Sequence, residues 1–295
     1  MPSHDLHAQC LYRTVPAKTH SSYRLFGLLI ASEFDLPLPP AEDGAVDVGV
    51  MRGSVDSMGE LLWHAEQPFA FSCRRTDDAI VLDWPEAQFC VRPTQVVVDT
   101  DAPEAAIPLL LQPVWSIVLA ARQRETLHGG VAESAGRSVG ILGTSGAGKS
   151  TALLALLDRG WRLVSDDIIS FDASGLVVPG PPFIRLEPDR ADGKATELDP
   201  TGKFRYFPAF CPDPVRLTSL VVQSDEYVCP TRLSGVEAVG AVLAQMYIPM
   251  LTDPGQGQRR FDLAVGLVHE VPVYGVPPRS LTARALEGIV EEATR

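Results

Sequence analysis

The sequence predicts an α/β protein in two parts, a β-rich N-terminal domain over residues 1–105 and a larger domain over residues 106–295. In the larger part we expect a mixed sheet flanked by helices. Three observations support this. Short alternating or apolar runs broken by turn residues fill residues 23–100, which is typical of strands. Apolar residues at helical spacing follow. Residues 138–157 then place an apolar strand, a glycine-rich loop and a helix-forming run in direct succession.

Composition narrows the class of protein. Of the 295 residues, 45% are hydrophobic and 21% charged, as in ordinary globular domains. We expect no membrane helix, since no apolar run approaches the roughly 20 residues needed, and no secretory signal, since residues 1–10 are polar. A net charge of −12 and a pI near 4.9 argue against nucleic acid as the main partner.

The cysteines indicate a reducing compartment, so we expect a cytoplasmic protein. They are odd in number, scattered and without a C-x-x-C pair, which favours free, mostly buried thiols over disulfides or a zinc site. The five are Cys10, Cys73, Cys90, Cys211 and Cys229.

The N-terminal region shows strands but no catalytic constellation. Cys73, Trp63 and Trp84 are expected in the core or half-buried. The expected strand regions are 23–30, 45–51, 69–73, 79–84 and 88–98.

A helix is predicted to start at residues 101–104, where a proline suits the first turn. Pro113 should bend this helix or mark its true beginning. Basic residues and then His128-Gly129-Gly130 follow its apolar face, and we expect them at the helix end. A strand is expected over 131–133.

The central motif is G-x-x-x-x-G-K-S, between an apolar strand and a helix begun near Lys149. Glycines let successive backbone N–H groups wrap an anion, and the helix N-terminus adds its dipole. The motif predicts a phosphate-binding (Walker A) loop for ATP and Mg²⁺, with Lys149 between the β- and γ-phosphates and Ser150 on Mg²⁺. The expected nucleotide-binding residues are Gly143, Thr144, Ser145, Gly146, Ala147, Gly148, Lys149, Ser150 and Thr151.

Two adjacent acids follow the next expected strand, 161–165, which Gly160 precedes as a left-handed helix cap. Asp166-Asp167 end that strand and 168–171 resumes it. Acids at a strand end shortly after a phosphate loop hold Mg²⁺ and polarise a nucleophile in such folds.

The remaining chain alternates loop, strand and helix. Residues 172–214 are rich in Pro, Gly and charge, and form either a functional lid or an irregular subdomain. Arg259-Arg260 are expected at the surface. The further expected elements are strands 215–223 and 271–276 and helices 236–250, 258–270 and 280–293.

Together the motifs resemble the catalytic core of the HPr serine kinase family, to which phosphoenolpyruvate carboxykinase is more distantly related. Leu127-His128-Gly129, the loop 143–150 and Leu163-Val164-Ser165-Asp166-Asp167 occur in that family's order and approximate spacing.

Other stretches resemble a subgroup, the HPr-kinase-like proteins of lasso and other ribosomal peptide pathways, in which a serine of the precursor peptide is phosphorylated. These are residues 179–189, Gly202-Lys203, and residues 23–28 and 36–38 of the N-terminal region. The E-I-R-G-type signature and the C-terminal K-loop of true HPr kinases are missing, which argues against HPr as the substrate. True HPr kinases are hexamers, and the altered C-terminal region leaves a homo-oligomer open.

The resemblance implies roles for individual residues. Asp166 would serve mainly Mg²⁺, and Asp167 would be the general base at the serine hydroxyl, although the two roles could be exchanged. Successive strand side chains face opposite ways, so the two acids are not expected to share one task. His128 would contact the γ-phosphate or the acceptor. Arg185 and Lys203 are candidates for stabilising the transferring phosphate or gripping the substrate.

The leading functional hypothesis is therefore a serine kinase acting on a peptide. A kinase for a small molecule, such as an amino acid or sugar alcohol, keeps the same chemistry. A nucleotide-binding regulatory module with little catalysis is the alternative from another class. A large groove beside the loop would favour the peptide, and a closed pocket the small molecule.

Overall fold

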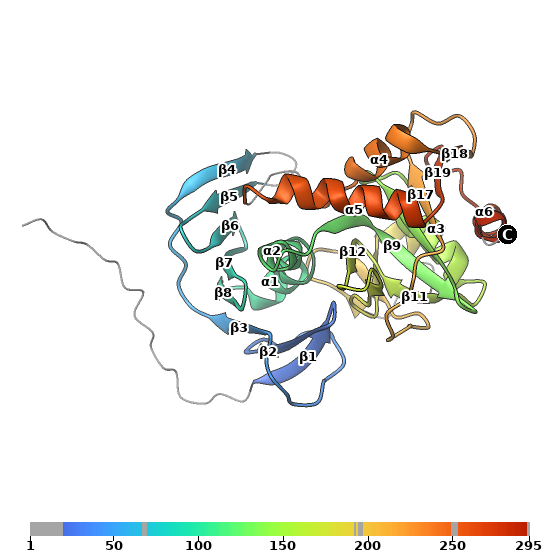
Figure 1. Cartoon of the computed structure of the whole chain (residues 1–295). Helices are drawn as coiled ribbons and strands as arrows, with labels where there is room; N and C mark the ends of the chain where they lie inside the picture. Colours follow the sequence, from blue (N-terminus) through green and yellow to red (C-terminus); the bar gives the residue numbers. More distant parts are fainter. Residues whose placement is uncertain (1–19, 67–69, 192, 194–196, 249–252, 294–295) are drawn as a thin grey trace, which may run out of the picture.

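The computed structural model describes residues 20–66, 70–191, 193, 197–248 and 253–293, and it contains two eight-stranded sheets and one small sheet. Figure 1 shows the first sheet (blue to teal) on one side of a green helical segment and the second sheet on the other. The fold is mixed α/β, as expected.

The N-terminal sheet runs in the order β1-β2-β3-β8-β7-β6-β5-β4, with only the β2–β3 and β3–β8 pairs parallel. The expected strand over 23–30 is a hairpin turning at Phe26-Gly27, whose φ angles are 49° and 77°. The start of the expected strand 69–73 lies outside the described residues. The strands are β1 Ser21–Leu25, β2 Leu28–Ser32, β3 Val48–Arg52, β4 Glu60–Ala65, β5 Phe71–Arg75, β6 Ile80–Trp84, β7 Ala87–Arg92 and β8 Gln95–Asp99.

The edge strand β4 was not predicted, because apolar and polar residues do not alternate along it. It is largely exposed, and Trp63 is 43% exposed, so the expected burial of Trp63 is wrong. Cys73 is buried and Trp84 packs against Phe71 and Phe89, as predicted.

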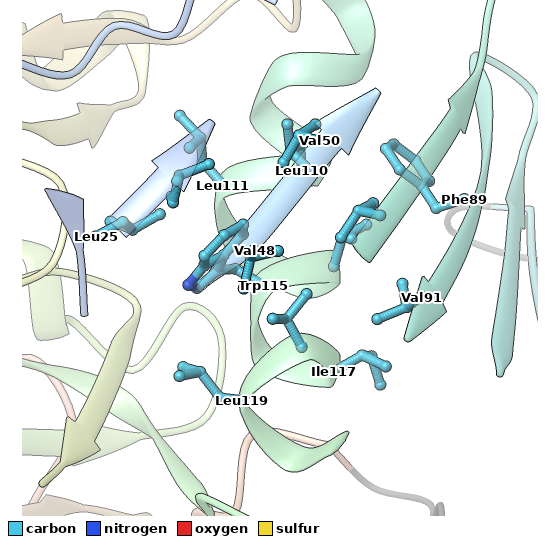
Figure 2. Packing of buried hydrophobic residues seen from close by; sticks show 14 of the residues in the cluster. Leu25, Val48, Val50, Phe89, Val91, Leu110, Leu111, Trp115, Ile117 and Leu119 are labelled. Carbon is cyan, nitrogen blue, oxygen red and sulfur yellow. The ribbon is translucent and has the colours of Figure 1, made fainter. Parts of the chain in front are cut away.

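One helical segment covers this sheet. It consists of α1 Pro103–Leu109, the π-helical turn η1 Leu110–Val114 and α2 Trp115–Ala121. Pro113 lies inside the π turn, and a widened turn accommodates a residue that cannot donate to the preceding turn. Figure 2 shows Trp115 and its apolar neighbours pointing at Val48 and Val50. The division at residue 105 stays a prediction.

This segment is also the one described helix that is long and apolar enough to cross a membrane, by length and composition alone. It has 19 residues, contrary to the expectation that no apolar run approaches this length, and 61% of its apolar window is buried inside the protein.

The second sheet runs β13-β12-β9-β10-β17-β19-β18, with β11 also pairing with β9. Alternate residues of β17 face opposite clusters: Val221 lies with the apolar residues of α3 and α6, and Leu220 and Val222 lie with those of α4 and α5. Helices therefore cover both faces. The strands are β9 Thr126–Ser134, β10 Arg137–Gly143, β11 Arg162–Ser165, β12 Ile168–Phe171, β13 Val177–Val178, β17 Ser219–Gln223, β18 Thr231–Leu233 and β19 Val273–Val276; the helices are α3 Lys149–Leu157, α4 Gly235–Leu243, α5 Gln256–Glu270 and α6 Ala283–Ala293.

Most expected elements of this region exist with shifted ends. The helix expected over 236–250 ends at Leu243, and residues 249–250 lie outside the described residues. Gly160 has a φ of 86°, as predicted for a left-handed cap.

Residues 172–214 contain a small antiparallel sheet, β14 Ile184–Leu186, β16 Phe204–Tyr206 and β15 Glu197–Leu198, with the 3-10 turn η2 Pro188–Arg190. Of the two alternatives stated for this segment, it therefore has the secondary structure of a small subdomain.

The surface placement expected for Arg259-Arg260 is wrong. Arg260 is buried, and both guanidinium groups bind the Glu125 carboxylate, Arg259 Nε at 3.1 Å and Arg260 Nε at 3.3 Å. Gln256 Nε2 donates to the same carboxylate at 3.0 Å. Helix α5 is thus tied to the segment before β9, because a buried carboxylate requires donors.

The described cysteines Cys73, Cys90, Cys211 and Cys229 form no disulfide, as predicted. The expectation that they are mostly buried holds for Cys73 and Cys211 only, because Cys90 is half-buried and Cys229 is exposed. Burial raises the pKa of the Cys73 thiol to about 11. Cys10 lies outside the described residues.

Candidate active site

The long strand β9 organises the site. On one side it pairs with β10, and on the other with β12 through residues 126–128 and with β11 through residues 131–133. Between β11 and β12 the chain leaves the sheet at Asp166-Asp167, opposite Gly129-Gly130. The Gly129 N–H donates to the Asp167 carbonyl at 3.2 Å. The two acids therefore lie at the gap between β11 and β12 along the same edge of β9.

Gly129 and Gly130 lie within β9, so their expected position at a helix end is wrong. A Cβ on Gly129 would lie 2.5 Å from the Ile141 carbonyl oxygen, and one on Gly130 would lie 2.8 Å from the Leu153 side chain. The glycines permit close packing between strands and helix rather than capping a helix.

The glycine-rich motif has the predicted strand, loop and helix order. β10 ends at Gly143 and α3 begins at Lys149. Gly143, Gly146 and Gly148 have φ angles of 151°, 81° and 107°, a region that side chains disfavour. Residues 144–146 are exposed, so the loop is open on its outer side.

Lys149 is largely buried, and its ammonium has three partners. Nζ lies 2.8 Å from the Gly143 carbonyl oxygen, 3.0 Å from that of Thr144 and 3.0 Å from His128 Nε2. Burial lowers the pKa of Lys149, and the charges of Asp167 and Asp166 oppose that shift. The ammonium is held at the base of the loop.

His128 connects Lys149 to the acids. Its Nδ1 lies 3.1 Å from the Asp167 carbonyl oxygen. Because a carbonyl only accepts and an ammonium only donates, Nδ1 carries the proton and Nε2 accepts from Lys149. Burial, and then the Lys149 charge, lower the pKa of His128, which favours this neutral form. The Tyr247 ring packs edge-on against the imidazole at 5.1 Å between centroids.

Asp166 and Asp167 have different surroundings. Asp166 is buried and accepts hydrogen bonds from the backbone N–H groups of Asp167 and Arg185; burial, and then the Asp167 charge, raise its pKa. Asp167 has a φ of 63°, and its Oδ2 accepts from the Gln112 amide. This separation supports different tasks for the two acids.

Arg185 is tied to protein groups on three sides. Its Nε donates to Asp199 Oδ2 at 2.7 Å, Nη1 donates to Gln112 Oε1 at 2.6 Å, and Nη2 donates to Thr201. Burial acts to raise the pKa of Asp199, but hydrogen bonds from Thr201 and Arg185 hold it below its usual value. Arg185 is thus linked to Asp167 through the Gln112 side chain.

Lys203 is not brought into these contacts. Its ammonium pairs with Glu187 at 2.8 Å, and both side chains are substantially exposed. Its role toward phosphate stays a prediction.

Two groups near the loop were missed by sequence reasoning. Arg279, with a φ of 56°, donates from its backbone to the Ala147 carbonyl at 2.9 Å and from Nε to the Gly146 carbonyl at 3.3 Å. Gln223 ends β17 opposite Gly143, and both polar atoms of its buried amide lack a hydrogen-bond partner among the residues that the structure describes. No local pattern marks either residue.

These observations fit a nucleotide with a divalent cation. The loop has the backbone freedom of an anion cradle, and Gln223 has unused hydrogen-bonding capacity beneath it. In the part of the chain that the structure describes, no three His, Cys, Asp or Glu side chains cluster as a metal site. A cation would therefore rely on Ser150, Asp166 and the phosphate oxygens of the nucleotide.

No protein-family model matches the chain. Over 109 residues it is 34% identical to the HPr kinase/phosphorylases of Burkholderia cenocepacia (strain HI2424) and Paraburkholderia phymatum. These matches cover 37% of this chain and 30% of each relative, so the chain spans less than a third of the curated relatives it matches. The HPr(Ser) kinase/phosphatase structure from Coxiella burnetii aligns with a TM-score of 0.31 and 15% identity, covering 58% of this chain and 99% of the other.

The chain is thus distantly related to the HPr kinase/phosphorylases over part of its length. The predicted resemblance is confirmed at this level. The closer relationship to kinases of lasso and ribosomal peptide pathways stays a prediction.

Proposed function

We propose that this chain is an ATP- and Mg²⁺-dependent kinase that phosphorylates a serine hydroxyl. The observation that carries the proposal is the chain of hydrogen bonds from Lys149 at the glycine-rich loop through His128 to the backbone carbonyl of Asp167, with the charges of both acids acting on Lys149. The distant relationship to HPr kinase/phosphorylases supports the same chemistry.

Each group has a task in this proposal. The backbone of residues 143–151 and the Lys149 ammonium bind the phosphates, and Ser150 and Asp166 hold the cation. Bound Mg²⁺-ATP supplies the phosphoryl group and neutralises its developing charge. His128, neutral, holds Lys149 in place through Nε2.

Asp167 orients the acceptor hydroxyl and accepts its proton. Its Oδ2 is occupied by Gln112, which leaves Oδ1 for the hydroxyl. His128 hydrogen-bonds to the backbone carbonyl of Asp167 and to the Lys149 ammonium. The imidazole therefore connects the backbone of the proposed base to the phosphate-binding lysine. Positioning of this kind supplies most of the rate in phosphoryl transfer.

We propose a peptide as the acceptor, in line with the resemblance to kinases of ribosomal precursor peptides. An open, largely apolar cavity of about 480 Å³ is a candidate site for peptide side chains, although none of its lining residues belongs to the loop 143–151. The lining residues are Pro37, Leu38, Pro39, Pro182, Glu197, Phe207, Pro208 and Phe210. Pro181 and Phe183, on either side of Pro182, line a small separate cavity together with Gln112 and Arg185.

Phosphotransfer from labelled ATP tests the proposal. The full chain is incubated with Mg²⁺, ATP and serine-containing precursor peptides, and a Lys149→Ala variant should lose about 10²–10³-fold in rate, as expected for removal of one electrostatic donor. Arg216→Ala, which breaks an exposed ion pair with Glu270, is the control.

Full activity of Lys149→Ala would overturn the mechanism. Labelling of amino acids or sugar alcohols but not of peptides would identify the small-molecule kinase. Slow ATP hydrolysis that no acceptor changes would identify a regulatory module.

A further inference from the structure

Gln112 lies in the helical segment that packs on the N-terminal sheet, but its side chain forms hydrogen bonds with residues of the second half of the chain. Its neighbours Leu110, Leu111 and Val114 are buried in the apolar cluster of the N-terminal sheet, and Figure 2 shows Leu110 and Leu111 among those residues. The Gln112 side chain instead reaches Asp167, at the break between β11 and β12 of the second sheet.

The orientation of the Gln112 amide follows from its two neighbours. Arg185 Nη1, 2.6 Å from Oε1, is a donor that cannot accept. An ionised carboxylate only accepts, so the amide N–H group must face Asp167. Each neighbour separately requires the same orientation of the amide.

Arg185 is itself immobilised, because Asp199 and Thr201 hold its other nitrogens. The Asp199 side chain is 0% exposed. The cavity beside Gln112, Arg185 and Asp199 has a volume of only about 10 Å³, so there is little free space next to the amide on this side. The line Asp199–Arg185–Gln112–Asp167 therefore runs from the small sheet to the candidate base.

The π turn explains how the helix supplies this residue. Residues 110–114 form a five-residue π segment in the middle of the helix, and π turns in helices occur frequently at functional sites. Leu110 and Leu111 face the N-terminal sheet while the next side chain, Gln112, points into the other half.

We propose that Gln112 is a positioning residue that fixes the rotamer of the Asp167 carboxylate for phosphoryl transfer. The inference rests on the proposed kinase function. It holds whether Asp167 serves as the base or exchanges roles with Asp166, since either task needs a fixed carboxylate. The helix on the N-terminal sheet thereby completes the site of the second sheet.

The test uses two variants of the full chain. Gln112→Glu keeps the size of the side chain and an acceptor for Arg185 but replaces the donor to Asp167 with a second carboxylate; Gln112→Ala removes both contacts. Each should lower kcat about 10- to 100-fold, the cost of a small misplacement of a reacting group, with KM for ATP nearly unchanged. Gln88→Ala, which breaks another half-buried Gln–Asp pair, to Asp83 at 3.2 Å, is the matched control.

A purely structural role predicts different results. In that case Tm would fall and kcat of the folded protein would not. A positioning role also predicts that Gln112→Glu adds nothing to Asp167→Asn, because residues that act as a unit are not additive. Wild-type kcat in both Gln112 variants, or full additivity with Asp167→Asn, would overturn the proposal.

The role of Gln112 can be tested even if the kinase proposal fails. If the wild-type chain phosphorylates no acceptor, the kinase function fails, and the inference is decided by a crystal structure of Gln112→Ala. An Asp167 carboxylate that leaves its rotamer would support the positioning role, and an unchanged carboxylate would refute it.

Discussion

The two large sheets bury different kinds of residue. Among the described residues of the N-terminal sheet, 20–66 and 70–100, the single buried polar side chain is Ser32. The region after residue 115 buries charged groups that include Lys149, Asp166, Asp199 and Arg260. Burying a charge is costly unless it is paired, and Lys149, Asp199 and Arg260 all have polar partners. This difference is consistent with the proposed site in the second half.

The largest expected effect comes from removing one carboxylate from each half and comparing the two rates of phosphotransfer. Asp167→Asn should lower phosphotransfer by about 10²–10⁴-fold, the usual contribution of a general base. Asp83→Asn, in β6 of the N-terminal sheet, should leave the rate unchanged. Equal effects of the two variants on initial rates with saturating ATP would contradict the placement of the site.

Core packing provides the second contrast. Trp115→Ala removes a fully buried ring from the helix on the N-terminal sheet and should lower the free energy of unfolding by about 3–5 kcal/mol. Trp63→Ala, on the exposed edge strand β4, should change it by about 0.5 kcal/mol or less. Urea unfolding measures both, and a similar loss for both variants would show that β4 is covered in solution.

A pair of glycines tests the close approach of strands at the site. Gly129→Ala places a methyl group 2.5 Å from the Ile141 carbonyl and should cost about 1–3 kcal/mol through overpacking. Gly266→Ala in α5 meets nothing within 4 Å and should stabilise by about 0.5–1 kcal/mol, because alanine favours the helix. Thermal unfolding gives the sign of each change; a stable Gly129→Ala protein would contradict the crowding at β9.

The pH dependence of stability gives the smallest effect. The pKa of His128 is lowered in the folded protein, so below about pH 6.5 the unfolded chain binds a proton that the folded chain refuses. Stability should therefore fall as the pH drops through that value, by at most about 1.4 kcal/mol per unit from this residue. His128→Gln should remove that part of the slope between pH 8 and 5, whereas His64→Gln on exposed β4 is the control that should retain it.

The sequence was most informative where function restricts local geometry. The order of strand, glycine loop and helix around Lys149, the break at Asp166-Asp167 and the cap at Gly160 follow from backbone requirements that only particular residues satisfy. These predictions needed no knowledge of distant contacts.

What the sequence did not reveal depends on partners far apart in the chain. Gln112 meets Asp167 and Arg185, and Arg260 meets Glu125, pairings that no spacing rule encodes. Gly129-Gly130 were expected at a helix end because glycine suits both a cap and a crowded strand. Pro113 was the one local indication near Gln112, since it predicted a disturbed helix.

The turn at Ala135-Gly136, with φ angles of 50° and 78°, joins β9 directly to β10. This hairpin costs little loop-closure entropy, because two residues link its strands. The β1–β2 hairpin of the N-terminal sheet, which turns at Phe26-Gly27, is equally local. The hydrogen bond between Gln112 and Asp167 instead joins residues 55 positions apart, so we expect it to form after these local pairings. A partly folded chain would then carry both hairpins before the candidate base has its partner.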